Sequence, residues 1–197
     1  MGVEIEIKIR IQGGFDAAAA MRGWQVSEHR PRHFEDNRLL DFPEATLRMR
    51  RCLLRVRTAG DDAILTFKGP PVESSDFKVR EEIEVSFESA AVLIQVLERL
   101  GLQLWFRYQK YRTEYKAEQP ESPGRLVHLA LDETPIGTFL EIEGSEDSIR
   151  GAARSMGVGQ ELFLTDSYYA LYLQYCRARG LPPGHMVFGE DFRSHRR

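Results

Sequence analysis

Apolar and charged side chains alternate strictly along the first stretch of the chain, residues 3–11. One face carries Val3, Ile5, Ile7, Ile9 and Ile11, and the other carries Glu4, Glu6, Lys8 and Arg10. A period of two residues over this length predicts a β-strand with one apolar and one charged face. The same alternation returns in later segments, which predicts a sheet whose strands share this division between two faces.

Further strands are predicted over residues 31–41, 53–58, 63–69, 78–87, 104–118, 125–132 and 138–143, and helices over 15–24, 89–100, 145–156 and 166–179. Ser89 is a good N-cap for the second of these helices, and Gly101 ends it. The pattern predicts one α+β domain, residues 1–183, in which helices pack outside an antiparallel sheet of about eight strands. Residues 184–197 are expected to form a flexible C-terminal tail.

The helices need apolar sheet faces to cover, so the charged faces are expected on the inner side of a strongly curved sheet. The expected acidic lining is Glu4, Glu6, Glu82, Glu84, Asp132, Glu141 and Glu143, and the expected basic lining is Lys8, Arg55, Arg57, Lys68, Arg80, Lys110 and Arg112. Enclosed charges must be paired, hydrated or bound to ions. Carboxylates bind Mg²⁺, and Arg and Lys bind phosphate oxygens, so a polyphosphate chain with its metal would satisfy both groups.

An ordered series of motifs then resembles a known family. Glu4-Ile5-Glu6-Ile7-Lys8 is similar to the ExExK signature of the CYTH family, the triphosphate tunnel metalloenzymes. The series continues through Asn37, Asp41-Phe42-Pro43, Leu54-Arg55-Val56-Arg57, Lys68, Arg80-Glu81-Glu82-Ile83-Glu84, Lys110-Tyr111-Arg112, Asp132, Gly137, Glu141-Ile142-Glu143 and Ser167-Tyr168-Tyr169. One ExExK alone is a weak signal, whereas this order from residue 4 to residue 169 is specific.

The resemblance implies an eight-stranded antiparallel β-barrel, the triphosphate tunnel, that binds a triphosphate with Mg²⁺ or Mn²⁺. It favours a triphosphatase that acts on inorganic, thiamine or nucleoside triphosphate. A class IV adenylyl cyclase, which converts ATP to cyclic AMP and pyrophosphate, is the alternative, and residues 68–84 are most similar to that branch. A non-catalytic module that binds polyphosphate or nucleotides is the alternative of another class.

The resemblance also implies roles for the lining. The expected metal ligands are Glu4, Glu6, Asp132, Glu141, Glu143 and Glu84; Asp132 would hold the metal or orient its waters. The expected phosphate ligands are Lys8, Arg55, Arg57, Lys68, Arg80, Lys110, Arg112 and Asn37. Lys8 and Lys110 could instead position the attacking water, and Glu82 is the candidate proton acceptor.

Some of these side chains have a structural alternative. Arg80, Glu82 and Glu84 could form an inner ionic network instead of a second metal site. His33 and Glu35 are set aside, because a nearby histidine is more often structural. Tyr108, Tyr168 and Tyr169 are expected to pack in the core rather than touch a base or thiamine ring.

Composition narrows the function classes. The 197 residues suit one domain, and a net charge of −3 does not favour a nucleic-acid or membrane-surface binder. No apolar run reaches the roughly 18 residues that a membrane span needs. Cys52 and Cys176 lack metal-ligand spacing and are expected to be free thiols in a reducing compartment. We therefore expect a cytoplasmic protein whose partner is a small-molecule triphosphate and which, like many such barrels, could form a homodimer.

Overall fold

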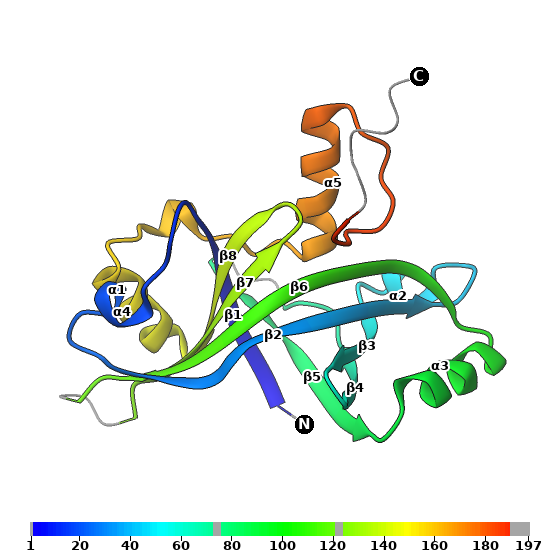
Figure 1. The fold of residues 1–197 in the computed structure, drawn as a ribbon, viewed down its shortest axis with the longest axis horizontal. Helices are drawn as coiled ribbons and strands as arrows, with labels where there is room; N and C mark the ends of the chain where they lie inside the picture. Colours follow the sequence, from blue (N-terminus) through cyan, green and yellow to red (C-terminus); the bar gives the residue numbers. More distant parts are fainter. Residues whose placement is uncertain (1, 73–75, 121–123, 190–197) are drawn as a thin grey trace.

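Eight antiparallel strands close into a barrel in the computed structural model, which describes residues 2–72, 76–120 and 124–189 (Figure 1). The strands are β1 Gly2–Ile11, β2 Gln25–Asp41, β3 Leu53–Ala59, β4 Asp62–Lys68, β5 Lys78–Phe87, β6 Gln103–Glu118, β7 Leu126–Thr134 and β8 Gly137–Gly144. Their order around the barrel is β1-β5-β4-β3-β2-β6-β7-β8. The predicted α+β fold with an eight-stranded antiparallel barrel is confirmed.

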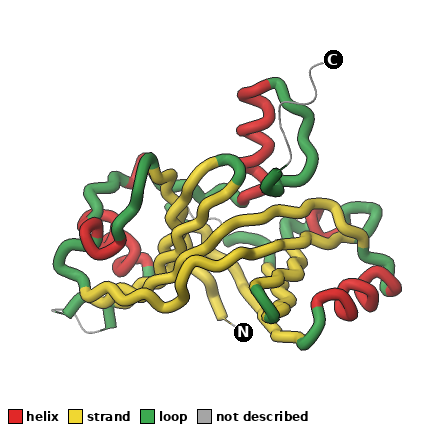
Figure 2. The backbone as a smooth tube through the Cα atoms, in the orientation of Figure 1, coloured by secondary structure: helices red, strands yellow, loops and turns green. Residues whose placement is uncertain are grey.

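The helices lie outside the strands (Figure 2). They are α1 Ala17–Ala20, α2 Thr46–Met49, α3 Ala90–Arg99, α4 Glu146–Ser155 and α5 Tyr168–Arg179, with a 3₁₀ turn at Gln160–Leu162. The hydroxyls of Ser89, Ser145 and Ser167 each accept a bond from the amide three residues on, which fixes the starts of α3, α4 and α5. Gly180 ends α5 with a φ of 63°, a left-handed conformation that costs glycine little.

The second strand differs most from its prediction. It begins at Gln25 instead of residue 31, and its pairing with β6 shifts register between Arg30 and His33. Pro31 lies in this interval and has no amide hydrogen for the ladder, so it interrupts the alternation from which a strand is recognised. The helix expected over 15–24 is only four residues long, and the four-residue α2 was not predicted.

The expected C-terminal tail is partly wrong. Met186 is fully buried, its amide donates to the carbonyl of Arg107 at 2.9 Å, and its own carbonyl accepts from the amide of Gln109 at 2.9 Å. Residues 184–189 therefore continue the packed structure along β6, because this strand has an edge and an apolar surface to offer them. Residues 190–197 of the expected tail lie outside the described residues.

The hydrophobic core lies between the barrel wall and the helices, in three clusters. Helix α4 covers β1, β7 and β8, and α1 contacts β2. Helix α5 covers β6 and the start of β8, and α3 covers β2 and β3, so the helices sit around the barrel (Figure 1). On β1, Ile7 and Ile9 pack outward into this core. Glu6 and Lys8, their neighbours in sequence, consequently point into the barrel.

Strands β1 and β5 pair over a short length, and the segment around Leu164 continues the pairing along β1. These strands pair only from Gly2 to Glu6 on β1. Beyond that point Lys8 exchanges two backbone hydrogen bonds with Leu164, at 2.9 and 2.8 Å. This bridge completes the wall and places the start of α5, with Tyr168, beside the charged interior.

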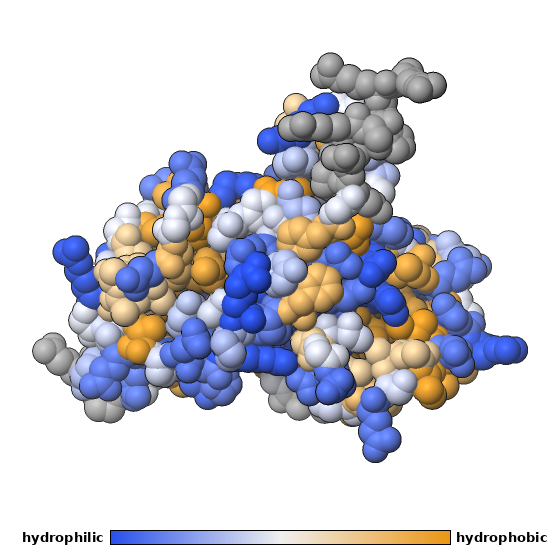
Figure 3. Space-filling view, viewed as in Figure 1, coloured by the Kyte–Doolittle hydropathy of each residue, from blue (hydrophilic) through white to orange (hydrophobic). Residues whose placement is uncertain are grey.

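The outer surface is mixed in character (Figure 3). Helix α3 buries Leu93 and Leu97 but leaves Val92, Val96 and Leu100 exposed, on the right-hand side of the view. None of the helices in the described ranges has the length and apolar character needed to cross a membrane.

Candidate active site

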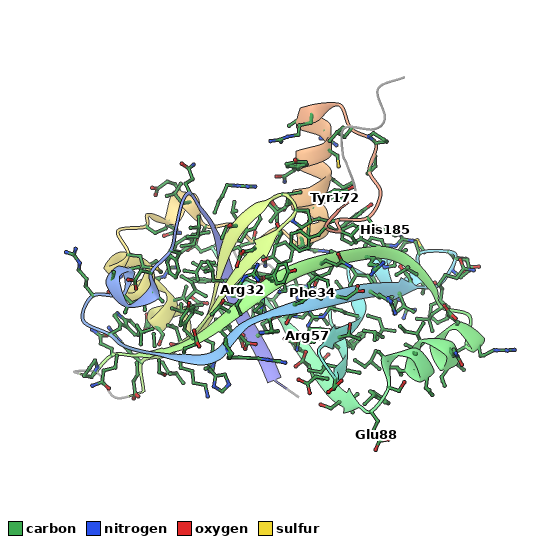
Figure 4. The ribbon with its side chains drawn as sticks, in the orientation of Figure 1. Arg32, Phe34, Arg57, Glu88, Tyr172 and His185 are labelled. Carbon is green, nitrogen blue, oxygen red and sulfur yellow. The ribbon has the colours of Figure 1, made fainter. Side chains whose placement is uncertain are left out.

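The barrel encloses a cavity of about 610 Å³. Its lining includes the predicted residues Glu4, Glu6, Lys8, Arg55, Arg57, Lys68, Arg80, Glu82, Glu84, Lys110, Arg112, Glu141 and Glu143. Two predicted residues, Asn37 and Asp132, do not line it. In Figure 4 Arg57 lies within the space that the strands enclose, whereas Phe34 and Arg32 are on the outer face of β2.

Lysines from β4 and β5 pair with the first two carboxylates of β1. Lys68 Nζ lies 2.6 Å from Glu4 Oε1, and Lys78 Nζ lies 2.5 Å from Glu6 Oε1. Burial opposes the charged form of Glu6, but the ammonium groups of Lys78 and Lys8 outweigh it and hold its pKa well below the usual value. The same burial lowers the pKa of Lys78 to about 8, despite the help of Glu6.

Lys8 connects the two acidic strands. Its Nζ lies 3.2 Å from Glu6 Oε1 and 3.0 Å from Glu141 Oε1. The guanidinium of Arg112 pairs with the other oxygen of Glu141. Burial alone would raise the pKa of Glu141, but Lys8 and Arg112 hold it well below its usual value. This carboxylate is therefore ionised and fixed by two cations.

Glu143 lacks such compensation. Burial, followed by the negative charges of Glu4, Glu6 and Glu82, raises its pKa to about 7. It lies where the cavity adjoins a second hollow of about 340 Å³, which Glu4, Glu82 and Glu84 also line. Four carboxylates thus meet at one mouth, where Glu4, Glu82 and Glu84 have cationic partners and Glu143 has no ion pair among the described residues. Such a set of oxygen donors fits a hard divalent cation such as Mg²⁺ or Mn²⁺.

The wall made by β3 and β4 carries positive charge that nearby carboxylates balance only in part. Arg55 is held by Thr66 Oγ1 at 3.1 Å and Tyr108 Oη at 3.4 Å. Arg57 approaches carboxylates only distantly, at 3.7 Å from Glu35 and 3.6 Å from Glu84. Burial and the neighbouring Arg55 lower the pKa of Arg57. A buried guanidinium beside another guanidinium is a strong site for an anion.

The side chain of Asp132 does not line the cavity. Its side chain is fully buried and accepts from Lys110 Nζ at 2.9 Å, Arg112 Nε at 2.7 Å, Arg112 Nη2 at 2.6 Å and Tyr168 Oη at 2.5 Å. Oδ2 accepts three of these hydrogen bonds and Oδ1 accepts one, so the carboxylate is held by four donors and lies outside the cavity lining. In this geometry Asp132 orients two cations of the lining, which differs from the expected metal ligation.

Asn37 is also fully buried and outside the lining, and neither its amide nitrogen nor its oxygen has a hydrogen-bond partner among the described residues. Tyr168 belongs to the core, as expected, packing on Tyr108 and Phe139, but its hydroxyl also bonds to Asp132. Tyr169 packs against Trp105 in the same cluster, and both residues also line one end of the cavity.

Two charged residues were left out of the predicted site although they belong to its network. Lys78, the first residue of β5, pairs with Glu6. Its spacing of two from Arg80 places it on the same strand face, and this was the signal that could have identified it. Glu35 is 1% exposed and lies 3.4 Å from Lys110, between that lysine and Arg57. The alternation of Glu35 with Asn37 on one strand was the signal that could have identified it.

Comparison with known proteins was made on the sequence and on the fold. The family model described as the CYTH domain matches residues 2–157. No curated protein gives a significant match.

Among solved structures, the PH1819 protein of Pyrococcus horikoshii is 26% identical, with a TM-score of 0.65 over 87% of this chain and 98% of that one. A candidate adenylate cyclase of Vibrio parahaemolyticus is 17% identical, with a TM-score of 0.68 over 85% of this chain and 96% of that one. HpAC1 from Hippeastrum, named for adenylyl cyclase and described as having a dominant triphosphatase activity, is 18% identical, with a TM-score of 0.55 over 91% and 98%. The last two share the fold with this chain.

Proposed function

This chain belongs to the CYTH domain family, and from that premise we propose that it is a metal-dependent triphosphatase that releases orthophosphate. The observation that carries the proposal is the double imbalance of charge across the cavity. At one side Glu143 has too few cations around it, and at the other Arg57 has too few anions. A triphosphate with a divalent cation supplies both missing partners at once.

The carboxylates of Glu4, Glu6, Glu141 and Glu143 would hold the metal, with Glu84 near the same mouth. When bound, Mg²⁺ or Mn²⁺ would neutralise phosphate charge and lower the pKa of a coordinated water. Asp132, which accepts hydrogen bonds from Lys110 and Arg112, would orient these two cations toward the substrate.

Arg55, Arg57, Lys68, Arg80 and Arg112 would bind phosphate oxygens and stabilise the charge that develops during transfer. Most of these cations are paired with carboxylates of the cavity. Binding would therefore be an exchange, in which cations turn to phosphate oxygens while carboxylates turn to the metal. Such pre-paired groups need little reorganisation.

Proton handling falls to a few groups. Burial and the nearby Glu4 raise the pKa of Glu82 against the effect of Lys68, which suits a group that accepts a proton from the attacking water. Lys8 and Lys110 are each held by two carboxylates, so they would position phosphate or water from fixed places in the cavity. Asn37 would gain partners if a phosphate oxygen reached it.

A class IV adenylyl cyclase is the second candidate, and one observation favours it. The cavity lining also includes Leu53, Trp105 and Tyr169, apolar and aromatic side chains that suit a nucleoside, and Arg48 lies over the Trp105 ring. The same surface would suit the organic part of thiamine triphosphate.

A product assay separates these candidates. Inorganic triphosphate, thiamine triphosphate and ATP are each supplied with Mg²⁺ and with Mn²⁺, and orthophosphate, pyrophosphate and cyclic AMP are measured. We expect orthophosphate without cyclic AMP, and we expect Glu6→Gln to abolish turnover while Glu133→Gln, on the outer face, retains it. Cyclic AMP with equal pyrophosphate would establish the cyclase instead. Triphosphate binding by calorimetry without any product would refute both enzymes in favour of a binding module.

The compartment and the association state of the protein belong to the same proposal. We propose a cytoplasmic enzyme whose ligand is a small triphosphate, and in which the exposed side of α3 is available to a second copy. Light scattering of the purified chain would measure the association state.

A further inference from the structure

A second group of metal-ligand atoms lies among the basic residues, apart from the acidic mouth of the cavity. His33 and Glu35 come from β2 and Glu114 comes from β6. One ligand atom of each lies within 4.8 Å of the others. His33 Nε2 is 3.5 Å from Glu35 Oε1 and 3.7 Å from Glu114 Oε1. The side chain of Glu35 is 1% exposed, so one of these ligands is almost wholly withdrawn from water.

The backbone fixes which nitrogen of His33 faces the carboxylates. His33 Nδ1 lies 2.9 Å from the carbonyl oxygen of Pro31. A carbonyl only accepts, so Nδ1 carries a hydrogen, and in the neutral imidazole Nε2 then presents a lone pair. Nε2 is buried and has no hydrogen-bond partner among the described residues. A histidine whose other nitrogen donates to a backbone carbonyl is the arrangement typical of metal ligation.

The register shift in β2 creates this orientation. Pairing with β6 runs from Arg30 opposite Glu114 to His33 opposite Arg112, so Pro31 and Arg32 lie opposite Thr113 alone and β2 accommodates one extra residue. A bulge of this kind bends the strand and re-aims its side chains. His33 and Glu35 are thereby turned toward Glu114 on the neighbouring strand.

Nε2 faces two carboxylates, and this arrangement calls for a positive charge between them. Glu35 raises the pKa of His33, so a proton supplies this charge when no metal ion is bound, and a metal ion would bind in place of that proton. We propose that His33, Glu35 and Glu114 bind a first-row divalent transition-metal ion such as Zn²⁺ or Mn²⁺. One imidazole nitrogen with two carboxylate oxygens suits these ions better than Mg²⁺ or Ca²⁺, which prefer oxygen alone. Three protein ligands leave further positions for water.

The neighbours of Glu35 link this site to the cavity. Lys110 Nζ lies 3.4 Å from Glu35 Oε2, and Arg57 Nη1 lies 3.7 Å from Glu35 Oε1. A cation bound to Glu35 would weaken the hold of this carboxylate on both, and would release them toward an anion in the cavity. This consequence rests on the proposed function, whereas the metal site itself does not.

The test measures metal binding without substrate or turnover. The full chain is freed of metal with a chelator and titrated with Zn²⁺ in excess Mg²⁺, while calorimetry gives the stoichiometry and long-range ¹H–¹⁵N spectra follow the imidazole nitrogens. We expect the His33 Nε2 resonance to shift, and we expect His33→Gln and Glu114→Gln each to lose one bound equivalent. His185→Gln, a histidine outside the cluster, is the matched control and keeps it. Circular dichroism checks that each variant is folded.

Unchanged Zn²⁺ stoichiometry in folded His33→Gln and Glu114→Gln would overturn the proposal. So would an Nε2 that stays protonated throughout the titration, because a proton would then occupy the gap. Glu6→Gln separates the two proposals: it should lose turnover yet keep the shift of the His33 resonance. The result for the metal site at His33 therefore does not depend on the result of the triphosphatase assay.

Discussion

Replacing Asp132 by asparagine tests whether this residue anchors the cations of the cavity. The substitution keeps the shape of the side chain but removes its charge, and it turns an amide group toward donors. Lys110, Arg112 and Tyr168 all now donate to the carboxylate, which is fully buried. Two buried cations would lose their shared anion.

The expected loss is large. Breaking a buried ion pair by removing one partner costs about 3–5 kcal/mol, against a total free energy of unfolding of about 5–15 kcal/mol. For a chain of this size each kcal/mol shifts the melting temperature by about 2–4 °C, so the midpoint should fall by about 6–20 °C. Thermal unfolding followed by circular dichroism measures this directly, with urea unfolding as a second measurement.

The neighbouring Glu133 supplies a matched control. It makes an equally well-aligned pair with Arg32, at 2.7 and 3.1 Å, but on the exposed outer face of the barrel. Glu133→Gln should leave the midpoint unchanged, since solvent screens exposed pairs. If Asp132→Asn lowered the midpoint by less than about 2 °C, the reasoning would be refuted, because the cations would then have other partners to turn to.

Three further predictions concern ligands. Metal binding requires an ionised Glu143, whose pKa is raised to about 7, so Mn²⁺ affinity should rise by up to about tenfold per pH unit below pH 7 and then level off. Glu143→Gln should flatten this profile, and a pH-independent affinity of the wild-type protein would contradict the prediction. Arg57→Ala should raise the KM for a triphosphate by about tenfold or more with little change in melting temperature, since Arg57 has few structural partners; an unchanged KM would place it outside the substrate site. Trp105→Ala should raise the KM for ATP and thiamine triphosphate but not for inorganic triphosphate, and equal effects on all three would remove Trp105 from recognition of the organic group.

Alternation along the strands was sufficient to predict an antiparallel sheet of about eight strands and most of its charged lining, whereas the closed barrel was implied by the resemblance to the CYTH family. Glu4, Glu6 and Lys8 follow each other at a spacing of two, and in an extended strand this spacing fixes their common face. What the spacing cannot give is the set of donors that reach a side chain from other elements. Asp132 has the right residue type and face, yet its oxygens are taken by β6 and α5.

The misplaced start of β2 has a related cause. Pro31 interrupts the ladder, so the alternation changes phase and His33 and Glu35 did not register as partners of Glu114. Lys78 was left out for a different reason, because its partner Glu6 lies on β1 and only the pairing of β1 with β5 brings the two side chains together. Both errors concern long-range pairing, which depends on register rather than on local sequence.

Because the apolar core lies outside the barrel wall, the outward-facing residues of each strand stabilise the fold, and a separate set of inward-facing residues lines the cavity. We expect changes at positions such as Ile7 and Ile9 to affect folding. Under the proposed function, we expect changes at Glu6 and Lys8 to affect which triphosphate binds, so that the substrate could change during evolution while the outer apolar layer is kept. For protein engineering, the interior therefore offers a set of positions where substrate preference can be varied and stability monitored as an independent property.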